Sequence, residues 1–212
     1  MALKFGIFDH MEQQPAIPLD QQYRERLDLL ALADHLGFYG YHLAEHHSAP
    51  LSVAPSQSVF LAAASQRTER IQLIPLVYCL PLYHPLRLVE EIAMLDNLSG
   101  GRLQIGVGRG ISSLEHRFWG NDPNLAALFR EAFEIVLAGL THPRLTYHGE
   151  HYVFEDVPIV LATKQKPYPA HLVPWQPEVC RTRGLNHLGG GSLKSLPAFA
   201  ARYREVSVAH RY

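Results

Sequence analysis

The chain has 212 residues, of which 47% are hydrophobic and 18% are charged, and its formal net charge is −1 at pH 7. This composition predicts one globular domain over residues 1–212 and gives little electrostatic support to nucleic-acid or anionic-membrane binding. No apolar run is long enough to span a bilayer, and the N-terminus does not read as a signal peptide. Because the chain has only two cysteines, a disulfide framework is not expected, and a reducing, cytoplasmic location fits.

In the N-terminal half, four apolar, β-prone runs alternate with three helical patterns. The expected strands cover residues 3–8, 38–44, 71–80 and 103–108. The expected helices cover residues 20–36 and 56–65, and a third begins at Pro85 and ends at Gly100. Near-continuous apolar strands separated by helices indicate parallel pairing, with helices covering the strands. Right-handed crossovers then give either an open doubly wound sheet or a barrel.

The loops of this half are of two kinds. Helix-to-strand turns are short and marked by glycine, as in "LSGGRL", whereas strand-to-helix loops are long: "DHMEQQP", "EHHSAP", "LPLYHP" and "GRGISSLEH". The unusual residues therefore all lie at the C-terminal ends of the strands, where a (β/α) barrel carries its active site. An open sheet concentrates its site at one switch point, so four contributing loops favour a barrel.

The alternation is weaker in the second half. We expect a helix over residues 124–140, a hairpin in "LTYHGEHYVFEDV", weak strands in "HLVP" and "GLNHLGGG", and a last helix over residues 195–209. About six strands result, whereas a full barrel has eight strands and typically about 250 residues. The predicted fold class is therefore α/β of the (β/α)8 TIM-barrel type, incomplete in this chain.

Two motifs carry ionisable groups at strand ends. In "LAEHHSAP", Glu45, His46 and His47 follow an apolar strand, and strand alternation lets only one of the two histidines face the barrel axis. The other interpretations are a surface loop with incidental histidines, or a metal site that takes further ligands from three nearby histidines: His10, His42 and His84. In "GVGRG", backbone N–H groups and Arg109 suit a phosphate, although the segment is equally typical of a tight turn.

Taken together, four stretches resemble the bacterial luciferase-like, flavin-dependent monooxygenases. They are "LKFGIF", "LAEHHSAP", "IQLIPLVYCLPLYHPLRLVEEIAMLDNLSGGRLQIGVGRG" and "REAFEIVLAGLTHPRLTYHGEHYVFEDVP", and the resemblance is good over residues 3–160. It implies a barrel that binds FMN reduced by a separate flavin reductase and uses O2 on a small organic substrate. A deazaflavin replaces FMN in some relatives.

The resemblance also implies roles for individual residues. His46 matches the catalytic histidine, and Glu45 would fix its tautomer or raise its pKa. Arg109 matches the arginine that meets the flavin phosphate, flanked by Gly108 and Gly110; some relatives have a cysteine at the position of Gly108. A non-proline cis peptide at the flavin site would fall at Leu76–Val77.

Reduced flavin reacts productively with O2 only where water is excluded. The apolar lining expected for the barrel comprises Phe5, Ile7, Leu76, Val77 and Ile105. The alternative to a monooxygenase is a non-catalytic or truncated flavin-binding protein of the same fold, because the phosphate-site loop after the fifth strand and the last two strands have no clear counterpart. A metal hydrolase on a similar barrel is a third reading. Unpaired edge strands and an exposed lining predict association, most simply as a homodimer.

Overall fold

The computed structural model describes residues 4–120, 124–174 and 186–188. The chain divides into two units, residues 1–171 and residues 172–212. The helices of the first unit are α1 (Leu19–His35), α2 (Gln57–Ser65), the short 3-10 helix η1 (Leu80–Leu82), α3 (Pro85–Leu98), α4 (Ser113–Phe118) and α5 (Leu125–Thr141). Its strands are β1 (Gly6–Asp9), β2 (Gly40–Leu43), β3 (Gln72–Pro75), β4 (Tyr78–Cys79), β5 (Ile105–Gly108), β6 (Arg144–His148) and β7 (Val153–Pro158). Strand β8 (His171–Pro174) begins at the last residue of the first unit, and β9 (Asn186–Leu188) lies in the second.

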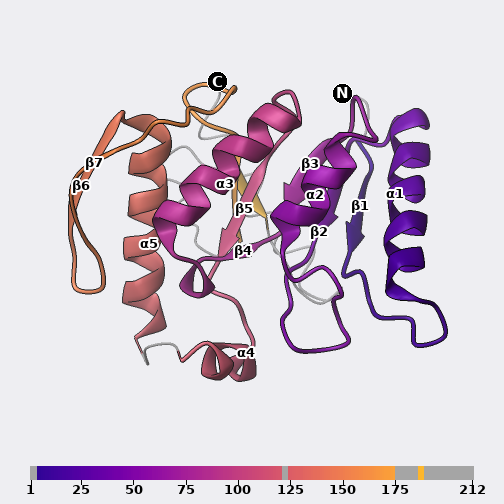
Figure 1. The fold of residues 1–212 in the computed structure, drawn as a ribbon, viewed down its shortest axis with the longest axis horizontal. Coiled ribbons are helices and arrows are strands. Elements are labelled where there is room, and N and C mark those ends of the chain that lie inside the picture. Colours follow the sequence, from indigo (N-terminus) through magenta and orange to yellow (C-terminus); the bar gives the residue numbers. More distant parts are fainter. Residues whose placement is uncertain (1–3, 121–123, 175–185, 189–212) are drawn as a thin grey trace, which may run out of the picture. The chain divides into compact units, whose positions relative to one another are not determined.

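Strands β1, β2 and β3 form a parallel sheet, and β4 pairs with β5 in parallel (Figure 1). One expected strand, residues 71–80, is split into β3 and β4 on either side of a cis peptide between Leu76 and Val77, the bond at which a cis peptide was predicted. A further parallel contact joins Leu73 to Leu103, just before β5. The weak strands predicted late in the chain are also present, as β8 and β9, and they pair in parallel.

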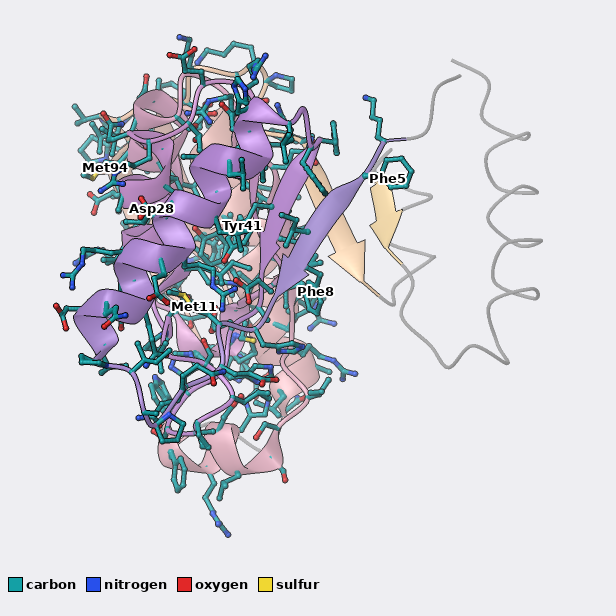
Figure 2. The ribbon with its side chains drawn as sticks, turned by 90° about the vertical axis from the view of Figure 1, so that its right-hand side faces the viewer. Phe5, Phe8, Met11, Asp28, Tyr41 and Met94 are labelled. Atoms are coloured by element: carbon teal, nitrogen blue, oxygen red, sulfur yellow. The ribbon has the colours of Figure 1, made fainter. Side chains whose placement is uncertain are left out.

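The sheet register separates a helix-facing side from the opposite side. Ile7, Tyr41 and Leu73 occupy one cross-strand row, and Tyr41 and Leu73 are fully buried. Tyr41 lies against Phe60 of α2, with 6.4 Å between ring centroids. Figure 2 shows α1 on this side of the sheet and Phe8 on the far side of β1. Burial of this row against α1 and α2 supplies part of the apolar core.

The predicted helices are confirmed to within a residue or two at their ends, except that the expected helix over residues 195–209 lies outside the described residues. The hairpin is formed by β6 and β7, which pair antiparallel. Two short helices were not predicted: η1, where a strand end and a loop were expected, and α4, which follows β5 where the sequence suggested only a loop. No helix in the described part of the chain combines the length and apolarity needed to cross a membrane.

Candidate active site

Side chains from the loops after β1, β2 and β5 meet beside β4 and the short helix α4. Glu45, His46 and His47 follow β2, and Glu115 lies in the first turn of α4. The first turn of α4 is capped locally, since Ser112 Oγ accepts a hydrogen bond from the Glu115 backbone N–H at 3.2 Å. A capping serine three residues before a glutamate is a known helix-start signature, and here it fixes the backbone position of Glu115.

Glu45 is buried, and its carboxylate has partners on three sides. Oε2 accepts hydrogen bonds from the Tyr83 hydroxyl at 2.7 Å and from the Cys79 backbone N–H at 3.4 Å. Oε1 lies 2.9 Å from Nε2 of His47. The expectation that Glu45 would fix the tautomer of His46 is therefore wrong, because the carboxylate faces the other histidine. His47 lies two residues after Glu45, and at this spacing its imidazole, rather than that of the adjacent His46, reaches the Glu45 carboxylate.

His46 instead meets Glu115, a residue that the sequence reading did not single out. Nδ1 of His46 is 3.3 Å from Glu115 Oε1, and the same oxygen accepts the His47 backbone N–H at 3.1 Å. Only 9% of the Glu115 side chain is exposed, so this contact is largely shielded from water. The "SSLE" segment was the available signal, because its capping pattern predicts a helix start and hence an ordered glutamate.

His10, from the loop after β1, stacks on His46 with ring centroids 5.3 Å apart and planes 21° apart. Nδ1 of His10 is buried and has no hydrogen-bond partner among the residues that the structure describes. Burial of an unpaired polar atom carries a free-energy cost, and such atoms are unusual away from functional positions. On the other side of the cluster, His47 packs against Trp119, with 4.6 Å between ring centroids.

Burial and nearby carboxylates keep the hydroxyl and thiol groups of the cluster protonated. Burial, with the charge of Glu45 as the next cause, raises the pKa of Tyr83 well above its usual value. The same two causes raise the pKa of the Cys79 thiol. Burial also raises the pKa of Tyr78, whose hydroxyl lies 2.8 Å from Ser58 Oγ. Tyr83 is therefore a fixed hydrogen-bond donor to Glu45 near neutral pH, and Cys79 is not a thiolate nucleophile.

Arg109 follows β5 at the same end of the strands. It is exposed, and within the described residues it forms no ion pair or side-chain hydrogen bond. Gly110 has a positive φ of 77°, and a Cβ there would lie 3.3 Å from Cys79 Sγ. Gly108 allows β5 to approach Val77, because a Cβ at this glycine would lie only 2.7 Å from Val77 Cγ2. Leu76 and Val77 are themselves half-buried.

Part of the expected apolar lining faces the wrong way. Ile7 shares its cross-strand row with Tyr41 and Leu73, so it points toward the helices and not toward the barrel interior. Gln104 bonds to Gln72, which lies on the side of the sheet away from the helices. The next residue, Ile105, is fully buried and therefore points toward the helices. The row that does face away from the helices contains Phe8, His42 and Ile74, and it is more polar than predicted.

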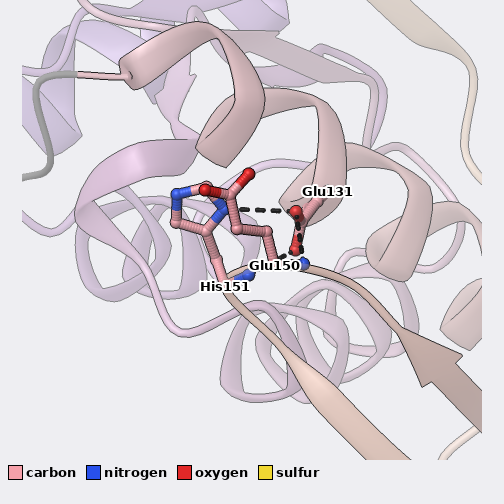
Figure 3. Close-up of side chains that lie close together, drawn as sticks. All are labelled: Glu131, Glu150 and His151. Carbon is pink, nitrogen blue, oxygen red and sulfur yellow. Dashed lines mark hydrogen bonds and ion pairs between the residues drawn. The ribbon is translucent and has the colours of Figure 1, made fainter.

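Within the described residues, one group of side chains has the spacing of a metal site, and it lies away from the histidines after β2. It consists of Glu131 on α5 with Glu150 and His151 in the turn between β6 and β7 (Figure 3). The Glu131 carboxylate already accepts the backbone N–H groups of Glu150, His151 and Tyr152 at 2.9–3.2 Å, and Nδ1 of His151 lies 3.1 Å from it. These contacts lower the pKa of Glu131 despite the opposing effect of burial. The group ties the hairpin to α5.

Parallel strands covered by helices, with polar side chains gathered where the strands end, define an α/β enzyme fold of the TIM-barrel type. Comparison with known proteins is more specific. The chain belongs to the luciferase-like monooxygenase family, whose model matches residues 3–200. The family predicted from the sequence is therefore confirmed.

Two curated relatives illustrate the range of similarity. Protein y4wF of Sinorhizobium fredii, which is uncharacterized, is 45% identical over 168 residues, covering 79% of this chain and 49% of that protein. The oxygenase component of the flavin-dependent trigonelline monooxygenase of Acinetobacter baylyi is 33% identical over 115 residues, covering 54% of this chain and 32% of that protein. The chain thus spans at most about half the length of these two relatives.

Solved structures agree with the fold class. Monooxygenase RslO1 from Streptomyces bottropensis superimposes with a TM-score of 0.89 at 29% identity, covering 98% of this chain and 66% of that one. The oxygenating constituent of 3,6-diketocamphane monooxygenase from Pseudomonas putida, solved with FMN, gives a TM-score of 0.82 at 20% identity, covering 99% and 63%. The predicted class, a TIM-barrel type of which this chain holds only part, is confirmed.

Proposed function

We propose that the chain is the oxygenase of an FMN-dependent monooxygenase that acts on a small organic substrate with O2. The observation that carries this proposal is Arg109, an exposed cation at the C-terminal end of β5 that has no acidic partner within the described residues. It lies between Gly108 and Gly110, where the missing Cβ lets Val77 and Cys79 pack close to the backbone. A guanidinium in this setting suits a phosphate group.

Three features of the site fit FMN. Arg109 would hold the phosphate, while Gly108 and Gly110 would let backbone N–H groups approach it. Leu76 and Val77 offer half-buried apolar surface to a planar ring. The ring of His10 stacks on His46, and its buried Nδ1 has no partner in the described part of the chain, so a bound ligand would complete its hydrogen bonding.

When bound in its reduced form, FMN supplies the electrons with which O2 is activated and one oxygen atom enters the substrate. The protein's own part is proton handling and exclusion of water. His46 is the proposed catalytic residue, because an imidazole can give or take a proton near neutral pH. Glu45 holds the imidazole of His47 by a hydrogen bond, and His47 packs on Trp119 and closes that side of the site.

Three further parts of the proposal concern partners and location. Reduced FMN would come from a separate flavin reductase. The name "oxygenase component" of the Acinetobacter relative supports a system of more than one component. The protein would work in the cytoplasm as a homodimer. Light scattering at several protein concentrations tests the dimer, and a mass that stays at that of one chain would contradict it.

The proposal is tested by titrating the full chain with FMN, oxidised in air and reduced under anaerobic conditions, and following flavin fluorescence or absorbance. Saturable binding of reduced FMN, weakened by Arg109→Ala, is expected. A deazaflavin that binds while FMN does not would replace the cofactor assignment. Binding of FMN without turnover on any organic substrate would favour the alternative, a flavin-binding protein without catalysis.

A further inference from the structure

We infer that Glu115 is a positioning residue that fixes the tautomer of His46, while Glu45 fixes the opposite tautomer of His47. The two histidines are neighbours in sequence, yet each faces a different carboxylate through a different ring nitrogen. Glu115 Oε1 lies 3.3 Å from Nδ1 of His46, and Glu45 Oε1 lies 2.9 Å from Nε2 of His47. The inference deepens the proposed function, and it rests on that function only for the role given to His46.

The chemistry follows from the donor and acceptor inventory of the two groups. An ionised carboxylate only accepts hydrogen bonds, so a neutral imidazole that meets it must carry its proton on the facing nitrogen. His46 is then protonated at Nδ1 and keeps an unshared pair at Nε2. His47 has the reverse arrangement, with its proton at Nε2. Only His46 therefore presents Nε2 as a proton acceptor.

Glu115 holds its position without help from His46. Its Oε1 also accepts the His47 backbone N–H at 3.1 Å, and its own backbone N–H is held by Ser112 Oγ at 3.2 Å. Its side chain is nine-tenths buried. The acceptor that faces His46 is thus fixed by the backbone of two segments, the β2 loop and the start of α4.

Glu45 is not available to take the place of Glu115. Its two oxygens are engaged by Tyr83, the Cys79 backbone and His47, and its side chain is fully buried. Burial and the charge of Glu45 keep Tyr83 protonated, so this donor stays in place near neutral pH. Stacking on His10 fixes the plane of the His46 ring, with 21° between the two ring planes.

The test reads the tautomers directly. The nitrogen chemical shifts of histidine side chains distinguish Nδ1–H from Nε2–H, and they are measured at about pH 9, well above the ordinary histidine pKa of about 6.5. In the unmodified full chain, His46 is expected as the Nδ1–H form and His47 as the Nε2–H form. Single substitutions of each histidine by glutamine assign the two signals.

Three variants separate the roles of the carboxylates. Glu115→Leu should convert most of His46 to the Nε2–H form, whereas Glu115→Gln, which keeps an acceptor oxygen, should retain Nδ1–H. The matched control Glu45→Leu should alter His47 and leave His46 unchanged. Should Glu45→Leu fail to fold, as judged by its backbone amide spectrum, the two Glu115 variants still decide the question.

A wild-type His46 found as Nε2–H, or a tautomer that does not respond to Glu115→Leu, would overturn the inference. A functional readout follows where the chain turns over: Glu115→Leu should lower kcat on the order of 100-fold, the usual effect of a misplaced catalytic group, and leave the FMN dissociation constant within twofold. The tautomer measurement needs no flavin. Failure to bind FMN would therefore count against the proposed function and not against this assignment.

Discussion

At the N-terminal ends of the parallel strands, the side chains of Asp34 and Arg102 form hydrogen bonds mainly with backbone groups of neighbouring segments. The Asp34 carboxylate accepts the backbone N–H groups of Glu69, Arg70 and Ile71 at 2.5–3.0 Å. Arg102 donates five hydrogen bonds, four to backbone carbonyls and one to Thr68 Oγ1. At the C-terminal ends the corresponding groups, Glu115 and Arg109, face a histidine ring and open solvent.

The difference separates stability from binding. Groups that are satisfied by backbone hold the helix-to-strand turns in place, and they have nothing left for a ligand. Within the described residues, Arg109 and the Nδ1 atom of His10 lack such partners. The exposed guanidinium of Arg109 is therefore free for a ligand, and the cost of burying the unpaired Nδ1 of His10 is recovered only when something binds. Substitutions at the two ends should consequently change different measured quantities.

The largest effect is expected for His46→Ala. If His46 handles a proton, turnover with reduced FMN and O2 should fall by about 10²- to 10⁴-fold, the usual contribution of general acid–base catalysis. The FMN dissociation constant should change little, because the flavin phosphate is assigned to Arg109. End-point product analysis on a substrate found by screening measures turnover, and a parallel FMN titration measures the dissociation constant.

His47→Ala is the matched control for this pair. It should be the milder change in turnover, because His47 contacts Glu45 and Trp119 rather than His10. A larger loss of turnover from His47→Ala would reverse the assignment of the catalytic histidine.

The next effect belongs to the other end of the strands. Arg102→Met keeps the aliphatic stem but leaves the carbonyls of Ser65, Ile71 and Ser99 without this donor. We expect the free energy of unfolding to fall by about 3–5 kcal/mol, because several acceptors in partly buried positions lose a charged partner. Urea unfolding followed by circular dichroism measures it.

Arg87→Met provides the comparison for Arg102. Arg87 forms an exposed i,i+4 ion pair with Glu91 on α3, with 3.0 Å between Nε and Oε1. Pairs of this kind contribute about 0.3–0.5 kcal/mol. Equal losses from the two arginine variants would show that the network at Arg102 adds nothing to stability.

Arg109→Ala should have the opposite signature from Arg102→Met. FMN affinity is expected to fall by about 1.5–3 kcal/mol, the usual contribution of a hydrogen bond to a charged group. Stability should stay within about 0.5 kcal/mol, since the side chain is exposed. Isothermal titration and urea unfolding of the same preparation give both numbers, and unchanged FMN affinity would remove Arg109 from the phosphate site.

Apart from the Arg87 comparison, the smallest effect concerns Asp34, and it depends on pH. Burial tends to raise the pKa of Asp34, but the three backbone N–H donors and Arg70 outweigh it and hold that pKa below its ordinary value. A depressed pKa means that the carboxylate stabilises the fold above the unfolded-state pKa of about 3.9 and that this contribution is lost as pH falls further, through the folded-state pKa.

Asp34→Asn should therefore be about 1–2 kcal/mol less stable than the unmodified chain at pH 7, because one amide N–H₂ then faces a backbone donor. The difference should shrink as the pH is lowered below about 4. Unfolding curves at a series of pH values check this, and a difference that is constant from pH 7 to pH 3 would contradict it.

Much of the first half of the fold could be predicted from the sequence, because apolar runs and helical periodicity alternate there without interruption. The elements with glycine or proline at their ends, such as α3 with Pro85 at its start, were placed to within a residue or two. The division of one expected strand into β3 and β4 was not predicted. The family resemblance implied only the cis peptide at Leu76–Val77, and Pro75, which has no N–H for strand pairing, was the unused local signal for a break.

The site was predicted in position but not in pairing. Loop length and residue type put Glu45, His46 and Arg109 at the C-terminal ends of the strands, which the structure bears out. Which carboxylate meets which imidazole depends on side-chain rotamers and on a helix 69 residues further along the chain, and neither follows from periodicity. The capping pattern at Ser112 was a signal for the helix start that we did not use, and nothing local ties Glu115 to His46.

The close approach of β5 to Val77 restricts the order in which this sequence can change. The family resemblance implied a cysteine in some relatives where this chain has Gly108. Any Cβ at that position would lie 2.7 Å from Val77 Cγ2 and 3.5 Å from its Cβ. A side chain could enter there only after Val77 had become smaller. A cysteine at position 108 would thus be deleterious in the present background and acceptable in one with alanine at position 77. The two positions should covary, and an evolutionary path between the glycine and cysteine forms of the site should pass through the change at position 77 first.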